Sequence, residues 1–254
     1  MTPRLRLWLL AGGGAGLAAF FLWGLLDLPA FGHYRGPYGT IIARVTVAQT
    51  HATGVVSAVN FFYRGFDTVG EEFILFTAAI GMATVLRMLA SDGDGDGDGA
   101  AAPGARRMQT SETVRMTALV FTGPVLVLGW FLTTHAQTDP SGGFQGGIVM
   151  ASAVIMIYLG GQFLVFRRIS PPDFVDALEA LGAGAFVLVG VGTLASGAAF
   201  LADVLPLGSP PGAVDASGTI ALISFFVGVE VTAAFALIVN ELLQQNFLVR
   251  ADRP

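Results

Sequence analysis

Six long apolar stretches run through this chain of 254 residues, and they restrict it to a fold that crosses a membrane. A helix of about twenty residues covers the roughly 30 Å of hydrocarbon in a bilayer. The composition agrees, because 54% of the residues are hydrophobic and only 12% are charged. We therefore expect an all-α, multi-pass membrane protein with about six transmembrane helices. The stretches are residues 7–26, 68–89, 116–134, 144–166, 180–202 and 218–239.

The arginines orient these helices. All 13 positive charges are arginine, and only Arg35, Arg44 and Arg64 fall on one side of a six-helix arrangement. The others fall on the opposite side, and positive charge collects in the cytoplasmic segments of membrane proteins. We therefore expect both termini in the cytoplasm.

Residues 90–113 separate the second apolar stretch from the third. Aspartate alternates with glycine from Asp92 to Asp98, and such a polar, glycine-rich segment cannot bury a core. It resembles the start of a calcium-binding loop, but Pro103 stands where a bidentate glutamate is required. We predict a cytoplasmic linker between a two-span unit, residues 1–89, and a four-span unit, residues 114–254.

The second stretch begins with charged residues. Glu71 and Glu72 must lie about one helical turn inside the bilayer if this helix is to span it. Asp67 lies four residues before Glu71 and shares its helix face, and Arg64 is placed to pair with Asp67. Ionisable groups at such depth are costly and usually functional, which makes these carboxylates candidates for an ion or proton path. The alternative is a cap that orients the helix at the interface.

Glu230 is the most deeply placed charge. It lies in the middle of the last stretch, where insertion of an acidic residue costs about 2.5–3.5 kcal/mol. Thr219 and Glu241 lie eleven residues away on either side, which is about three helical turns, so the three residues form a polar line. An ion or proton path and a structural hydrogen bond between helices both explain such a residue.

The segment between the third and fourth stretches is rich in glycine. It resembles a phosphate-binding loop only superficially, because it lacks the terminal lysine. An aspartate and proline before paired glycines suit a tight turn into the next helix, and small residues four apart let helices approach closely. His135 precedes this loop as a candidate proton relay or interface cap. The loop residues singled out are Pro140, Gly142, Gly143, Phe144, Gly146 and Gly147.

Catalytic and metal chemistry find little support. The chain has no cysteine and 3 histidines, without the spacing of metal ligands. No grouping of a nucleophile with a base is present either, so we expect no enzymatic activity, no metal and no cofactor.

Two motifs resemble a known family. Residues 64–71, Arg-Gly-Phe-Asp-Thr-Val-Gly-Glu, resemble a signature of the large Mrp antiporter subunit, near its carboxyl end, and of the small E-type subunit of membrane-bound hydrogenases. Residues 140–147, Pro-Ser-Gly-Gly-Phe-Gln-Gly-Gly, resemble the signature of the MnhB/MrpB family of Mrp-type Na+/H+ antiporter subunits, with Ser141 where glycine is usual. The chain thus resembles an MnhB-type subunit fused to an E-like unit.

This resemblance implies an accessory subunit of a multi-subunit Na+/H+ antiporter in the cell membrane. Its partners would be large antiporter-like subunits and other small membrane subunits, and Asp67 and Glu71 match the family motif. Two alternatives stay open: a subunit in the membrane arm of an energy-converting hydrogenase or related oxidoreductase, and a purely structural scaffold.

Overall fold

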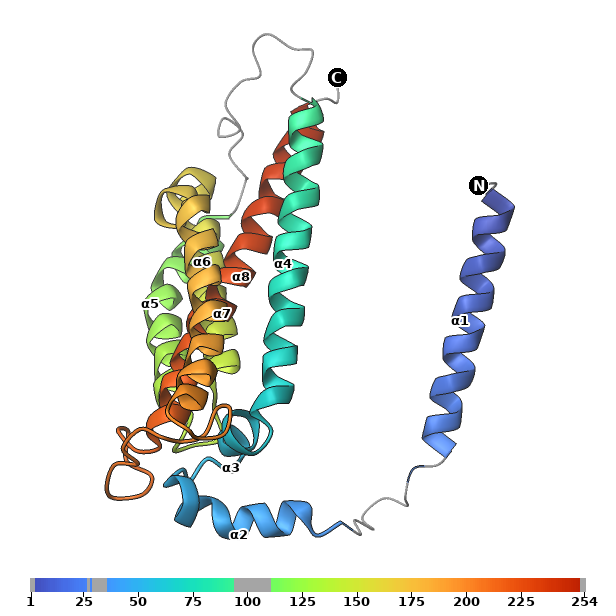
Figure 1. Ribbon diagram of the computed structural model, residues 1–254. Coiled ribbons are helices and arrows are strands. Elements are labelled where there is room, and N and C mark those ends of the chain that lie inside the picture. Colours follow the sequence, from blue (N-terminus) through green and yellow to red (C-terminus); the bar gives the residue numbers. More distant parts are fainter. Residues whose placement is uncertain (1–2, 27, 29–35, 94–110, 252–254) are drawn as a thin grey trace. The chain divides into compact units, whose positions relative to one another are not determined.

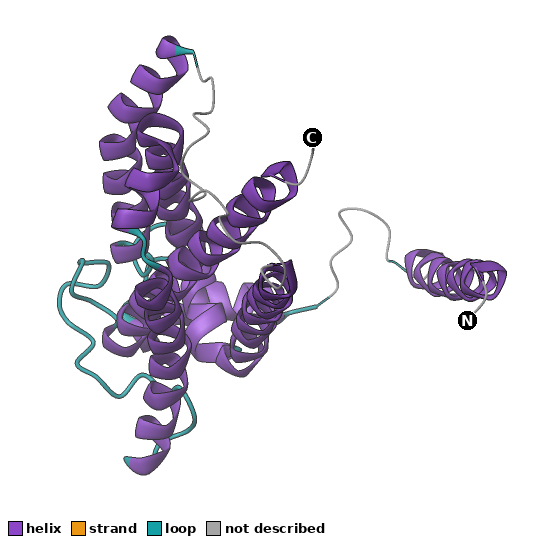
Figure 2. Ribbon diagram, turned by 90° about the horizontal axis from the view of Figure 1, so that it is seen from above, coloured by secondary structure: helices purple, strands orange, loops and turns teal. Residues whose placement is uncertain are grey.

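The computed structural model describes residues 3–26, 28, 36–93 and 111–251, and within these ranges it contains helices and loops but no strand (Figure 2). The chain divides into two compact units, residues 1–41 and 42–254. Most of the predicted linker, residues 94–110, lies outside the described residues. The boundaries 1–89 and 114–254 therefore stay a prediction.

Within the described ranges, six helices are long and apolar enough to cross a membrane, as the apolar stretches predict. In the first unit this is α1 (Pro3–Leu26). In the second unit, α4 (Gly65–Gly93), α5 (Glu112–Thr134), α6 (Gly143–Ile169), α7 (Pro172–Ala195) and α8 (Gly218–Ala251) form a bundle (Figure 1). The chain is thus an all-α, multi-pass membrane protein.

Short helices precede α4 at one end of this bundle. They are α2 (Tyr38–Thr50), of which residues 42–50 belong to the second unit, α3 (Val55–Ala58) and the π-helix η1 (Val59–Tyr63). The backbone nitrogen of Gly54 donates to the carbonyl of Gln137, and that of Gly212 donates to the carbonyl of His51. These bonds fix the loops after α5 and α7 at the same end, which we call the α3 end.

Helix α8 is the centre of the bundle and the most deeply buried of the candidate spans. It packs against α4, α6 and α7, and more lightly against α5 (Figure 1). Lipid tails are as apolar as leucine, so close van der Waals packing rather than hydrophobic burial holds such helices together. Small residues on α8 and its neighbours provide that packing.

Three glycines within residues 142–147, Gly143, Gly146 and Gly147, are at two helix crossings. A Cβ on Gly143 would overlap the carbonyl oxygen of Ser224 on α8, and one on Gly147 would lie 2.7 Å from Cβ of Val231. One on Gly146 would lie 2.6 Å from the carbonyl oxygen of Gly129 on α5. The segment therefore lets α6 touch α8 on one side and α5 on the other.

One predicted span is displaced. The apolar stretch 180–202 suggests a helix over those residues, but α7 runs from Pro172 to Ala195. Proline is favoured in the first helical turn, where its missing N–H costs nothing, and Gly197 follows the end with a φ of +82°. The displacement places three acidic residues, Asp173, Asp176 and Glu179, on the helix itself.

Candidate functional site

The start of α4 holds a neutralised charge pair. Nε of Arg64 donates to Oδ2 of Asp67 at 2.6 Å, and the two side chains are 60% and 53% exposed. The hydroxyl of Thr68 donates to the carbonyl oxygen of Asn60 at 2.7 Å and so joins α4 to the π-helix. Such π-turns are frequent at functional sites. Asp67 thus lies at the surface of the second unit, next to its own counter-ion.

Beyond this pair, a cavity of about 530 Å³ lies between the two motif segments. Glu71 and Glu72 line it from α4, and Ser141, Gly142 and Phe144 line it from the loop and first turn of α6. The two motifs are about seventy residues apart in the sequence, and their placement around one cavity is a result of the tertiary fold. The hydroxyl of Ser141 is buried here without a hydrogen-bond partner in the described part of the chain.

Glu72, which lines this cavity, forms a buried carboxyl pair with Glu230 of α8. Glu72 is 4% exposed and Glu230 is fully buried, and their side chains approach each other across α4 and α8. Within the described residues, Oε2 of Glu72 and both carboxyl oxygens of Glu230 have no well-formed hydrogen bond. Two carboxylates in contact repel each other, and a shared proton or a bound cation relieves that repulsion.

Close helix packing holds Glu230 in this position. A Cβ on Gly182 of α7 would lie 2.6 Å from Cβ of Glu230 and 2.8 Å from its backbone nitrogen. The absence of a side chain at Gly182 therefore lets α7 touch α8 at the level of the buried carboxyl. Solvent cannot reach Glu230 from this side.

A third buried carboxyl continues the line along α7. Glu179 is 1% exposed, and its Oε1 has no hydrogen-bond partner among the described residues. It lies three residues before Gly182, about 4.5 Å along the helix axis, on the side away from the α3 end. Its charge acts on Glu230. We call Glu72, Glu230 and Glu179 the acidic line.

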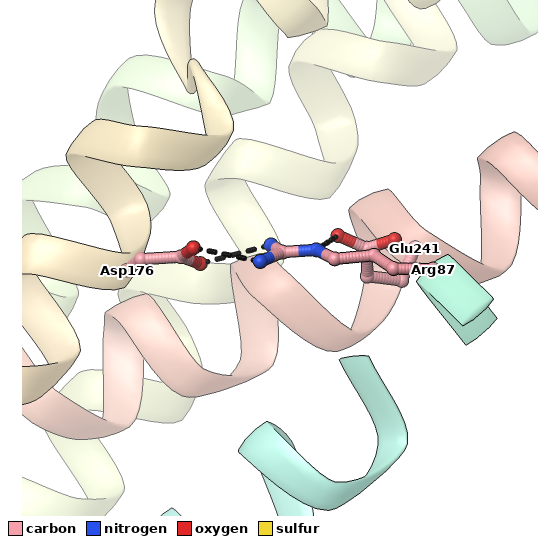
Figure 3. A network of polar contacts seen from close by, with 3 residues as sticks. All are labelled: Arg87, Asp176 and Glu241. Atoms are coloured by element: carbon pink, nitrogen blue, oxygen red, sulfur yellow. Dashed lines mark hydrogen bonds and ion pairs between the residues drawn. The ribbon is translucent and has the colours of Figure 1, made fainter. Parts of the chain in front are cut away.

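The acidic line ends at an arginine. Arg87 of α4 donates from Nη1 and Nη2 to the two carboxyl oxygens of Asp176 on α7, at 2.9 and 3.1 Å, and from Nε to Glu241 on α8, at 2.7 Å (Figure 3). We call the end of the bundle that holds this cluster the Arg87 end. The arginine distribution predicts that this end is cytoplasmic.

At the α3 end, the predicted polar face of α8 has a different role. The backbone nitrogen of Thr219 donates to Oδ1 of Asp203 at 2.9 Å, and its hydroxyl accepts from the nitrogens of Val204 and Leu205. Burial raises the pKa of Asp203, and the hydrogen bonds from Thr219 and the charge of His51 oppose that rise. Thr219 and Asp203 thus cap the helix that contains Glu230.

The remaining candidates lie away from the acidic line. The ring of His135 stacks on Phe131, and its Nδ1 lies 3.0 Å from the carbonyl oxygen of Phe131 at the end of α5. Pro140 is exposed in the loop before α6. Glu71 is exposed where it lines the cavity, so the two adjacent glutamates differ in burial. Among the described residues, no group of three or more His, Asp or Glu side chains is arranged to hold a metal ion.

Sequence reasoning missed Glu179, Asp176 and Arg87. Glu179 directly precedes the apolar stretch 180–202, so the sequence suggests that it lies at the terminus of a helix. In the structure it is the eighth residue of α7. Pro171 and Pro172 before Asp173 are the available signal, because proline marks the start of a helix rather than its interior.

The larger part of the bundle is similar to a known protein family. The family model described as "Domain related to MnhB subunit of Na+/H+ antiporter" matches residues 113–237, which include α6, α7 and most of α8. The B-type subunit of a Na+/H+ antiporter from Bacillus subtilis is 29% identical over 96 residues, covering 37% of this chain and 65% of that protein. An uncharacterised protein of Methanocaldococcus jannaschii is 28% identical over 86% of this chain and 89% of its own length.

Two solved structures share the fold. A chain of the membrane-bound sulfane sulfur reductase, an archaeal respiratory membrane complex, superposes with a TM-score of 0.67 at 25% identity, covering 94% of this chain and 98% of that one. A chain of the Mrp complex from Dietzia sp. superposes with a TM-score of 0.64 at 20% identity, covering all of this chain and 27% of that one. Residues 113–237 of this membrane protein are therefore similar to the MnhB domain, and the chain shares its fold with chains of the two solved complexes.

Proposed function

We propose that this chain is a membrane subunit of a cation/proton antiporter-like complex, in which the acidic line forms part of the route of a cation or proton. Its partners are the large antiporter-like subunits and the small membrane subunits of that complex, and it performs no enzymatic reaction of its own. The match to the MnhB family model and the similarity to B-type antiporter subunits support this class of complex. They span only part of this chain, so the route itself is argued from the geometry.

The observation on which the proposal depends is the buried carboxyl pair beside the cavity. Glu72 and Glu230 lie against each other, and the described part of the chain offers neither of them a basic side chain. Buried charge without a partner is costly, so a structural role alone does not explain why two carboxyls meet here. An unneutralised pair of this kind suits a route that loads and unloads a positive ion.

The level of the pair in the bundle fits the same role. Glu230 is the thirteenth residue of α8, about 18 Å from its start, which is near the centre of a hydrocarbon layer about 30 Å thick. The cavity approaches this level from the α3 end. Glu179 continues toward the Arg87 end, so the carboxyls form successive steps across the membrane.

The test is exchange of Glu230 for glutamine, which keeps the shape and removes the charge. In everted vesicles that contain the assembled complex, we expect Glu230→Gln to abolish Na+-dependent dissipation of a respiration-driven proton gradient. Glu112→Gln is the matched control, because Glu112 is a 75% exposed carboxylate at the start of α5. Normal transport by an assembled Glu230→Gln complex would exclude the acidic line from the route.

One observation favours a second candidate function. This chain covers 98% of a chain in a respiratory sulfur reductase, an extent that the match to the B-type antiporter subunits does not reach. A protein in the membrane arm of such an oxidoreductase would use the same acidic line within a larger redox complex. Purification of the native complex separates the candidates, since iron–sulfur proteins in it support the second and their absence supports the first.

A further inference from the structure

The Arg87 cluster joins three helices through one side chain. Arg87 lies on α4, and its two partners, Asp176 and Glu241, lie on α7 and α8 (Figure 3). The guanidinium is planar and presents its donors in a fixed fork, which suits simultaneous contact with two carboxylates. The cluster lies where the acidic line reaches the Arg87 end of the bundle.

The two partners of Arg87 are unequal. Asp176 receives two parallel hydrogen bonds, and its side chain is 37% exposed. Glu241 receives one bond from Nε, and its side chain is only 5% exposed. The bidentate contact with Asp176 therefore anchors the arginine near the surface, and the single contact with Glu241 reaches into the interior.

Two buried polar side chains close to the cluster in sequence have hydrogen-bonding atoms without a partner in the described residues. Glu179 lies one helical turn from Asp176, and its Oε1 has no hydrogen-bond partner in the described ranges. Asn240 precedes Glu241 on α8; it is fully buried, and neither its amide oxygen nor its amide nitrogen has a partner there. With Asp176, Glu179 and Glu241 ionised, a single arginine leaves this region negatively charged. It therefore offers a positive ion both charge and oxygen ligands.

We propose that Arg87 is a tethered counter-ion that closes the Arg87 end of the acidic line, and that a cation entering from this end displaces it from Glu241. Asp176 holds the guanidinium during the exchange, so the arginine moves aside without leaving the cluster. Arg87 is a positioning residue in this scheme, because it acts on the cation through Glu241. The inference rests on the proposed function, since it requires that the acidic line be the route.

The test measures the KM for Na+ in everted vesicles, in which the end predicted to be cytoplasmic faces the medium. Arg87→Gln frees Glu241 for the cation, so we expect the KM for Na+ to fall about fivefold, the effect of one partly exposed ion pair. The maximal rate should fall as well, because the cation leaves more slowly. The double variant Arg87→Gln/Glu241→Gln should restore the KM toward that of the wild type.

Asp176→Asn should change the KM for Na+ in the opposite direction. Without its anchor, Arg87 pairs with Glu241 alone and closes the line more firmly, so the KM for Na+ should rise. If the cluster is merely structural, both variants should lose assembled complex, and their KM values should not change in opposite directions. Arg115→Gln is the control, because Arg115 lies on α5 and donates to the carbonyl oxygen of Gly160 rather than to the acidic line.

Defined outcomes decide the proposal. An unchanged or raised KM in an assembled Arg87→Gln complex overturns it, and a lowered KM supports it. If Arg87→Gln does not assemble, Asp176→Asn decides. A raised KM for Na+ in that variant supports the proposed role of Arg87, and an unchanged or lowered KM overturns it. If Glu230→Gln abolishes transport but these KM values do not change, the proposed role of Arg87 is excluded while the proposed function stands.

Discussion

The carboxyl pair Glu72–Glu230, on α4 and α8, and the Arg87 cluster, on α4, α7 and α8, lie at two levels of the bundle and differ in how their negative charge is balanced. Each brings two carboxyls from different helices together. Only the cluster contains a positive side chain, and only the cluster lies near the end of the bundle, where water and headgroups reduce the cost of charge. Of these two sites, the one whose carboxyls lack a fixed positive partner is therefore the interior one, where a mobile ion would be needed.

Exchange of the two adjacent glutamates should give the largest contrast. Glu72→Gln removes half of the buried pair, so we expect at least about a tenfold loss of transport, the effect of losing one charged hydrogen-bond partner. Glu71→Gln changes an exposed carboxylate of the cavity and should reduce transport much less. Both rates are measured in everted vesicles with equal amounts of complex. Equal losses in the two variants would contradict the distinction between buried and exposed carboxyls.

Filling the space beside Glu230 with a side chain should lower the thermal stability of the complex, and this effect should be intermediate in size. Gly182→Ala places a Cβ 2.6 Å from Cβ of Glu230, so α7 must move away from α8, at a cost of about 1–3 kcal/mol for overpacking. The midpoint of thermal unfolding of the purified complex measures this loss. Gly184→Ala lies on the same helix with nothing within 4 Å of its new Cβ, and it should leave that midpoint unchanged. A Gly182→Ala complex as stable as Gly184→Ala would show that α7 does not fix the carboxyl pair.

The smallest effect is expected outside the spans, at Asp203. Burial raises the pKa of this carboxyl in the folded chain, so the folded state binds its proton more tightly than the unfolded state does. Its contribution to stability is therefore greatest below the pKa of the unfolded chain and declines as the pH rises through the folded value. Asp203→Asn should remove this decline while its Oδ1 still accepts from Thr219.

Melting temperatures of the wild-type and Asp203→Asn complexes across mildly acidic pH check this expectation. As the pH rises, the melting temperature of the variant should increase relative to that of the wild type. A constant difference would mean that the ionisation of Asp203 is not linked to unfolding in this range.

The residues of the site differ in how far the sequence could predict them. The depth of Glu230 follows from its place in an apolar stretch, because the membrane imposes a length on each helix. The ion pair between Arg64 and Asp67 follows from a spacing of three residues on one helix. Glu179 could not be found in this way, since its helix begins at Pro172 and not at the first residue of the apolar stretch.

The order of the amino acids is enough to establish that the chain is an all-α membrane protein with six long apolar helices, and that residues 64–72 and 140–147 are unusual within it. Length and hydropathy suffice for this, because the bilayer acts on each helix separately. The folded bundle is needed to show that Glu72 rather than Glu71 meets Glu230, and that Arg87 joins Asp176 to Glu241. Those contacts depend on the rotation of each helix about its axis, which close packing at Gly143, Gly147 and Gly182 sets.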